Sequence, residues 1–128
     1  MKIEVSNGEI LDKLSILAIK LEKISDEEKI KNIQIEYQIL SESYKQLISE
    51  FGESLIELYD KLKEINQKLW DIENSIRECE ESNDFSNHFI TLARNIYITN
   101  DRRSMLKKQI NIRTKSKLIE EKSYHNYI

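Results

Sequence analysis

The residues best suited to binding chemistry lie between Asn100 and Lys107. At helical spacing, Phe89, Ala93 and Ile96 form one apolar stripe of a predicted helix. The next positions on this stripe are polar or cationic: Asn100, Arg103, Lys107 and Asn111. A stripe that turns cationic halfway along a helix indicates either that the helix leaves the core or that a buried acid needs a partner.

Glu73 is the acid that such a cation would pair with. It lies between Leu69 and Ile76 on nearly the same face of a second predicted helix. A buried carboxylate is costly unless it is paired, and a planar guanidinium can satisfy both of its oxygens. We therefore predict that Arg103, and with it Arg94, reaches across to Glu73.

The candidate site between these two helices has six residues: Trp70, Glu73, Arg94, Asn100, Arg103 and Lys107. Two interpretations stay open. The two arginines and the lysine suit a ligand that carries a carboxylate or a phosphate. The same residues suit a structural Glu–Arg network that fixes the register of the helices, with Asn100 completing the hydrogen bonds and Lys107 in solvent. Ion-pair networks often serve packing, so the structural interpretation is preferred.

Other patterns that could support catalysis are weak. Glu9-x-x-Asp12 places two carboxylates on one helical turn, which could hold a divalent metal. Capping by Glu9 and a favourable interaction of Asp12 with the helix dipole are the preferred roles. Cys79 lies in an acidic stretch that disfavours a reactive thiolate, and neither histidine has zinc-ligand spacing. We predict no catalytic residue, no metal and no cofactor, so an enzyme is less expected than a binding protein.

A heptad pattern on each side of Gly52 predicts a long helical hairpin over residues 26–80. Apolar residues recur at alternating steps of three and four in both halves, over 30–51 and over 55–76. Gly52 can adopt the left-handed conformation that a helix end often needs. If the chain reverses there, the two seams match rung for rung. The hairpin is then antiparallel and roughly 35 Å long.

Two further helices complete a predicted all-α, four-helix bundle. Ser6 and Glu9 have the spacing of a capping box at the start of a first helix, which packs along the second helix only as far as Leu40. A fourth helix over about 86–111 runs back along the third. The Gly52 end of the hairpin is therefore expected to project with less cover.

Two packing contacts follow from this arrangement. Leu40 is expected to pack against Ile65 in the seam of the hairpin. Leu118 and Ile119 are expected to dock a short C-terminal helical turn onto the bundle.

Length and composition limit the class of protein. The chain has 128 residues, a net charge of −3, no proline and two glycines, which favours one domain, 1–128, of long helices. The near balance of charge argues against nucleic-acid binding. The most apolar stretch, near residues 10–24, is too short and too charged to span a membrane. A single cysteine and an N-terminus unlike a signal peptide predict a cytoplasmic protein without an internal disulfide.

Four segments of the chain together carry a family resemblance: VSNGEILDKLSILAIKLEKI, LWDIENSIRECE, FITLARNIYITNDRRSMLKKQIN and LIEEKSY. They resemble a family of small bacterial and phage-borne proteins catalogued as a domain of unknown function. The resemblance covers nearly the whole chain and implies a soluble helical protein near genes for surface-glycan synthesis, with no catalytic residues to carry over. The recurring motifs of the family match these residues: Trp70, Asp71, Glu73, Arg77, Arg94, Asn100, Asp101, Arg102 and Arg103.

The expected function is that of a non-catalytic helical interaction or accessory module. The resemblance links this role to surface-glycan synthesis. We expect a homodimer, and a protein partner would bind at the hairpin tip near Gly52. The alternative is a small enzyme or sensor that binds an anionic metabolite between the third and fourth helices. Neither nucleic acid nor a membrane is expected as a partner.

Overall fold

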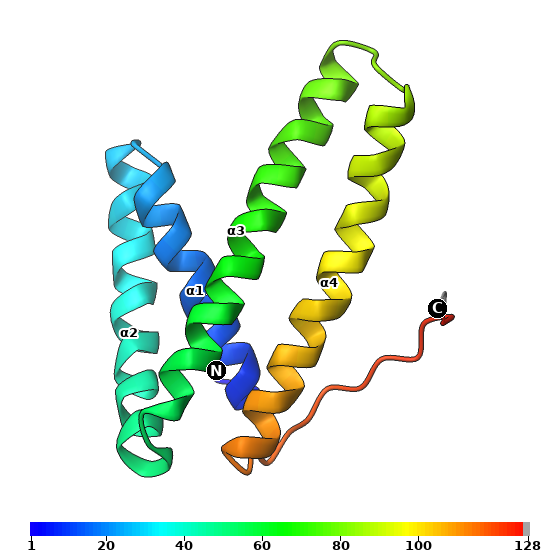
Figure 1. Ribbon diagram of the computed structural model, residues 1–128. Coiled ribbons are helices and arrows are strands. Elements are labelled where there is room, and N and C mark those ends of the chain that lie inside the picture. The colour runs from blue at the N-terminus through cyan, green and yellow to red at the C-terminus, as the bar shows by residue number, and fades with distance from the viewer. Residues whose placement is uncertain (127–128) are drawn as a thin grey trace.

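The computed structural model describes residues 1–126, which form four helices and no strand (Figure 1). The helices are α1 (Asn7–Lys23), α2 (Glu27–Phe51), α3 (Ser54–Glu81) and α4 (Asn87–Arg113). The predicted all-α, four-helix fold is confirmed.

Short polar residues set the starts of three of these helices. The Ser6 hydroxyl accepts a hydrogen bond from the Glu9 backbone N–H, and the Ser86 hydroxyl accepts one from that of His88. Asp26 caps α2 through the backbone N–H groups of the next turn. Gly52 ends α2 with a φ of 93°, which residues with a side chain rarely adopt. The capping side chains of Ser6, Asp26 and Ser86 satisfy backbone N–H groups that a helix leaves unpaired at its start.

The four helices form two hairpins, α1 with α2 and α3 with α4. Figure 1 shows α1 lying between α2 and α3, which meet at the Gly52 end and diverge away from it. At the Gly52 end, where α2 and α3 meet, the rings of Tyr44 and Tyr59 are in contact, with their centroids 4.8 Å apart. The seams of α2 and α3 are therefore adjacent over only part of their length.

The predicted pairing of apolar residues of α2 with those of α3 does not extend along the whole hairpin, because α1 packs against the remaining apolar positions. Leu69 of α3 lines a groove with Ile16 and Ile19 of α1. Leu40 of α2, expected to face Ile65, lines a hollow that includes Ile10 of α1. The reason lies in α1 itself, whose apolar residues occupy more than one side and need more than one neighbour.

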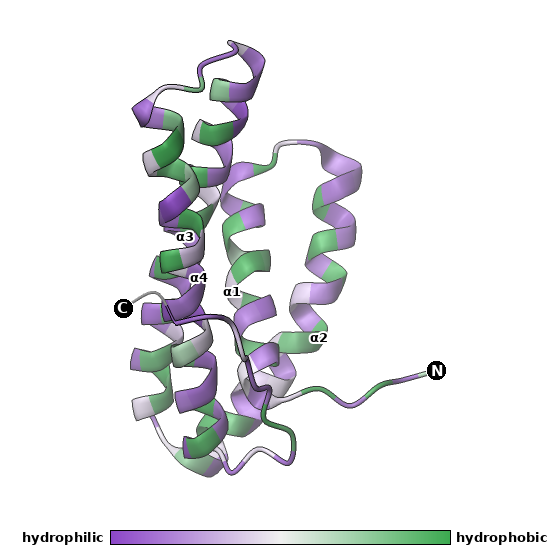
Figure 2. Cartoon of the chain, turned by 90° about the vertical axis from the view of Figure 1, so that its right-hand side faces the viewer, coloured by the Kyte–Doolittle hydropathy of each residue, from purple (hydrophilic) through white to green (hydrophobic). Residues whose placement is uncertain are grey.

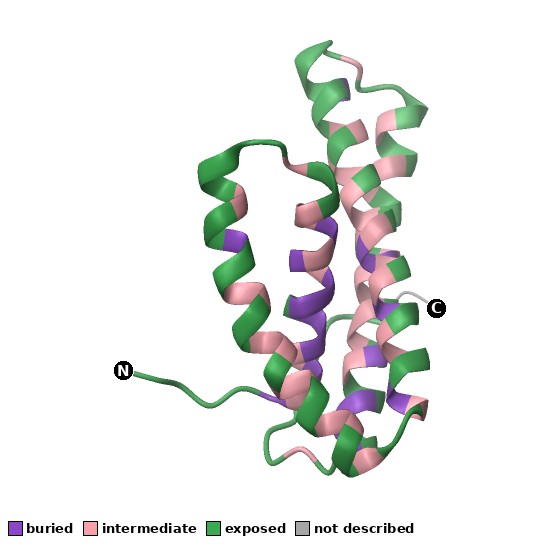
Figure 3. Ribbon diagram, turned by 90° about the vertical axis from the view of Figure 1, so that its left-hand side faces the viewer, coloured by how far each residue is buried: buried purple, intermediate pink, exposed green. Residues whose placement is uncertain are grey.

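The hydrophobic core lies at the Gly52 end, where all four helices contribute. Its buried residues come from α1, α3 and α4 and are Leu11, Leu55, Leu62, Leu106 and Ile110; partly buried residues of α2, among them Tyr44, Leu47 and Ile48, pack against them. The prediction that this end projects with less cover is wrong. Figure 3 shows buried residues along α1 and the adjoining parts of α3 and α4, whereas the far end of the α3–α4 hairpin is mostly exposed. The start of α1 packs near Gly52, so the opposite end of α3 and α4 is left without cover.

The segment after α4 runs past the start of α1 as an extended strap (Figure 2). Between Ser116 and Asn126 it contains no helix, so the predicted C-terminal helical turn is wrong. Leu118 and Ile119 nevertheless line a hollow together with Val5. None of the four described helices is long and apolar enough to cross a bilayer.

Candidate functional site

Asp12 of α1 is the centre of a polar cluster that joins three helices. It is buried, with only 1% of its surface exposed. Arg103 of α4 donates from Nε to its Oδ1 at 2.8 Å and from Nη2 to its Oδ2. Asn66 of α3 donates from Nδ2 to the same Oδ1 at 2.9 Å. Both carboxylate oxygens are therefore satisfied, as a buried charge requires.

Ser15 and Lys107 extend this cluster on either side. Asn66 Nδ2 donates its second hydrogen bond to Ser15 Oγ, at 2.7 Å. The Ser15 hydroxyl in turn donates to the Asp12 backbone carbonyl. Lys107 Nζ lies 2.6 Å from Glu9 Oε2 and 4.0 Å from Asp12 Oδ2. Bonding to Asp12 raises the pKa of the Arg103 guanidinium, so this group stays charged. The cluster clamps α1 to both α3 and α4.

The predicted pairing of Arg103 with Glu73 is wrong. Glu73 instead pairs with Arg77, four residues further along α3, with 3.7 Å between Oε2 and Nε. This pair is largely exposed. Arg103 bonds to Asp12 because α1 packs between α2 and the α3–α4 hairpin, and the carboxylate of Asp12 is buried more deeply than that of Glu73.

Three other predicted site residues, Asn100, Lys107 and Arg94, differ in whether they join this cluster. Asn100 accepts a long hydrogen bond of 3.5 Å from Arg103 Nη1, in the completing role that was expected. Lys107 is not in solvent, because it joins the cluster through Glu9. Arg94 is exposed and does not line the groove, so it is not part of the site.

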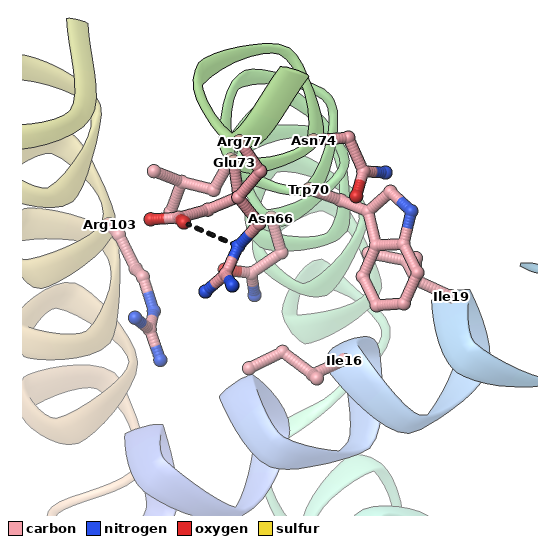
Figure 4. A pocket seen from close by; sticks show the side chains of 9 residues that line it. Ile16, Ile19, Asn66, Trp70, Glu73, Asn74, Arg77 and Arg103 are labelled. Atoms are coloured by element: carbon pink, nitrogen blue, oxygen red, sulfur yellow. Dashed lines mark ion pairs between the residues drawn. The ribbon is translucent and has the colours of Figure 1, made fainter. Parts of the chain in front are cut away.

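A groove of about 440 Å³ adjoins the cluster where α1 diverges from α3 (Figure 4). Its apolar wall contains Ile16, Ile19, Leu69 and Trp70. Its polar lining contains Asn66, Glu73, Asn74, Arg77 and Arg103. In Figure 4, Trp70 and Asn74 lie on the side of Ile19, while Arg103 approaches from the opposite side. The predicted residues Trp70, Glu73 and Arg103 are therefore brought together at one groove.

Neither a metal centre nor a reactive thiol is evident in the described residues. No group of three potential metal ligands occurs among residues 1–126. Burial, followed by the charges of Asp84 and Glu78, raises the pKa of the Cys79 thiol. A raised pKa keeps the thiol protonated, which disfavours nucleophilic attack.

The start of α1 makes a second close contact with α4 that the sequence prediction missed. Gly8 donates its backbone N–H to Asn111 Oδ1 at 2.6 Å. A Cβ atom on Gly8 would lie 2.5 Å from the Lys107 carbonyl oxygen. The glycine of the SNGE segment is thus needed for close approach of two helices, and Asn111 is polar because it binds this N–H.

The missed partner Asp12 had a signal in the sequence. It lies next to Leu11 and one turn before Ser15 and Ile16, inside the most apolar stretch of the chain. An acid flanked by apolar residues on a helix with two apolar sides is expected to face a neighbouring helix. That neighbour must then supply a cation.

Comparisons with curated proteins and with solved structures give no match. The model of a family described as a family of unknown function (DUF6165) matches residues 1–128. The predicted membership of an uncharacterised family is thereby confirmed. Because the match covers the chain from end to end, the protein belongs to the DUF6165 family of unknown function.

Proposed function

We propose that this protein is a non-catalytic helical binding module, and that the groove between α1, α3 and α4 holds a small organic ligand. The observation that carries this proposal is the pairing of charges around the groove. Arg103 holds Asp12, Arg77 holds Glu73, and Lys107 holds Glu9. The cluster thus forms a fixed wall for binding, with its acids already engaged.

The absence of a catalytic role is supported by the state of the groups near the groove. A general base needs a lone pair that is free to take a proton. Both oxygens of Asp12 already accept hydrogen bonds, and Asp12 is buried behind Arg103. The Glu73 carboxylate already forms an ion pair with Arg77. These acids suit positioning better than proton transfer.

Binding is supported by the size and lining of the groove. Ligand sites are usually concavities of about 300–1,000 Å³ with mostly apolar walls and a few fixed polar groups. The groove has about 440 Å³, an apolar wall that includes Trp70 and Leu69, and polar groups fixed by the Asp12 cluster.

Tryptophan fluorescence tests this proposal directly. Trp70 is the only tryptophan, so a change in its emission reports on the groove. We expect a screen of nucleotides, sugar nucleotides and dicarboxylates to yield a compound that shifts both the emission and the melting temperature. The thermal shift should disappear in Trp70→Ala and persist in Ile39→Ala, a control on the exposed face of α2. Compounds that stabilise both variants equally would contradict binding in the groove.

The anionic-metabolite alternative rests on Arg77 and Arg103, which both line the groove. Each already pairs with a carboxylate, so an anion would have to compete with Glu73 or Asp12. The charge balance therefore favours this alternative less than an uncharged ligand. The link to surface-glycan synthesis and the partner site near Gly52 stay predictions.

The homodimer also stays a prediction. Large apolar side chains such as Ile35, Ile39 and Phe85 are more than half exposed, and dimerisation would cover such surface. Light scattering at high micromolar concentration should give twice the chain mass. A monomer mass under these conditions would rule the dimer out.

A further inference from the structure

Asn66 presents an acceptor to the groove. The residue is only 5% exposed and lines the groove. Its Nδ2 group donates to both Asp12 Oδ1 and Ser15 Oγ, at 2.9 and 2.7 Å. This fixes the orientation of the amide, because the opposite orientation would place its carbonyl oxygen against the Asp12 carboxylate. The Oδ1 atom accepts no hydrogen bond from any side chain in the described part of the chain.

Arg103 presents donors beside this acceptor. Its Nε and Nη2 groups bind Asp12, whereas Nη1 makes only the 3.5 Å contact with Asn100. A guanidinium has five N–H donors, so donors remain on its outer edge. Asn66 and Arg103 both bind Asp12 Oδ1, at 2.9 and 2.8 Å, so the two side chains are neighbours. The buried carboxylate therefore holds a residue with a free acceptor next to a residue with free donors, and both residues line the groove.

The charge balance and the shape of the wall limit what can bind there. The two cations that line the groove are matched by Asp12 and Glu73, so a ligand with a full charge gains little net attraction. Trp70 and Leu69 offer an apolar wall, and the face of an aromatic ring suits a flat partner. An uncharged ligand with one flat face fits these two conditions.

We infer that the groove takes a flat, uncharged heterocycle with an amide edge, whose N–H donates to Asn66 Oδ1 and whose C=O accepts from Arg103. This inference rests on the proposed function and names the ligand class for the same groove. The amide edge matches the two fixed groups in hydrogen-bond polarity, and Trp70 stacks on the ring. Pyrimidine bases of the uracil type have this chemistry.

Two methylated uracils give a matched test on the intact protein. 1-Methyluracil keeps the N3–H that the inference requires, whereas 1,3-dimethyluracil has a methyl group in its place. Titration of Trp70 emission and ligand-observed NMR should show 1-methyluracil binding. The dimethyl compound should bind at least about tenfold more weakly, because Asn66 Oδ1 would lose its donor. Lys45→Ala should leave this preference unchanged, since Lys45 is exposed, pairs with Glu42 on α2 and does not line the groove.

The outcomes separate the inference from the proposed function. Equal affinity for the two compounds, or no binding of 1-methyluracil up to its solubility, overturns the amide-edge inference. If benzoate or inorganic phosphate changes Trp70 emission while 1-methyluracil does not, the inference fails and the groove remains a binding site. If no compound in the broader screen changes Trp70 emission, the proposed function fails as well.

Discussion

At the scale of single residues, Asp12 is the buried acid that joins three helices beside the groove. It is buried and receives hydrogen bonds from two different helices, through Arg103 and Asn66. Removal of one member of a buried pair leaves the other charge without compensation. The loss of Asp12 would therefore affect α3 and α4 together.

Asp12→Ala is expected to lower the free energy of unfolding by about 3–5 kcal/mol, because Arg103 would stay partly buried without its acid. Urea denaturation measures this change. Glu36→Ala is the matched control, since the Lys13–Glu36 pair is exposed and its loss should cost under about 1 kcal/mol. Similar costs for the two variants would mean that Asp12 contributes no more than a surface acid.

Two partly buried tyrosines in contact, Tyr44 and Tyr59, predict a loss of stability at alkaline pH. Burial, and then the charges of Asp60 and Tyr37, raise the pKa of Tyr44 to about 12. Burial, followed by the charges of Tyr37 and Tyr44, raises the pKa of Tyr59 further above its usual range. A raised folded-state pKa means that the unfolded chain loses its proton first. The stabilising effect is complete below the unfolded value of about 10 and declines as pH rises through the folded value.

The double variant Tyr44→Phe/Tyr59→Phe should therefore lose less stability than the parent protein between about pH 10 and pH 12. Melting temperatures of both proteins across this range give the comparison. Lysines titrate in the same range, and their contribution cancels because both proteins contain the same lysines. Parallel pH profiles would show that the two phenols titrate alike in the folded and unfolded chains.

At the scale of elements, the contact between the start of α1 and the end of α4 sets how the hairpins join. Gly8 and Asn111 are both buried, and the strap after α4 adds two acceptors: Ser116 Oγ accepts from the Asn7 backbone N–H and Glu120 Oε2 accepts from Asn111 Nδ2. The Ser6 hydroxyl, which caps α1, also donates to Glu120. Two N-terminal donors of α1, the backbone N–H groups of Asn7 and Gly8, are thus satisfied by side chains from the other end of the chain.

Gly8→Ala is expected to destabilise the protein by about 1–3 kcal/mol, because the new methyl group would press on the Lys107 carbonyl. In an open helix the same change would raise stability, since alanine is the better helix former. Ser49→Ala, at an exposed position of α2, serves as the control and should be neutral or slightly stabilising. Thermal unfolding of both variants tests the prediction, and a more stable Gly8→Ala protein would contradict the close approach.

At the scale of the whole molecule, stability is concentrated at one end. The core residues and the Asp12 cluster lie toward the Gly52 end, whereas the far end of the α3–α4 hairpin extends beyond the cover of α1 and α2 (Figures 1 and 3). Cys79 is the only buried residue between positions 67 and 98, all of which are described. Phe85 and Phe89 pack edge to face there, with centroids 5.3 Å apart.

Hydrogen exchange should reveal this gradient along α3 and α4. We expect backbone amides of residues 74–95 to exchange faster than those of residues 55–66 and 103–111, because few buried contacts oppose local opening there. Mass spectrometry of peptides from the two regions measures the difference. Uniform protection along both helices would indicate that the far end is covered in solution, as it would be in a dimer that uses this surface.

The sequence alone determined the number of helices, their approximate limits and the stretch of α4 where polar residues face inward. These properties depend on periodicity and capping, which act between residues close in the chain. It also indicated Trp70 and Arg103 as residues of one site. Only the tertiary structure decided that α1 lies between α2 and the α3–α4 hairpin and that Asp12 is the acid for Arg103. The apolar heptad positions of α2 and α3 can pack against any apolar neighbour. Their pattern therefore cannot specify whether α2 packs against α3 or against α1.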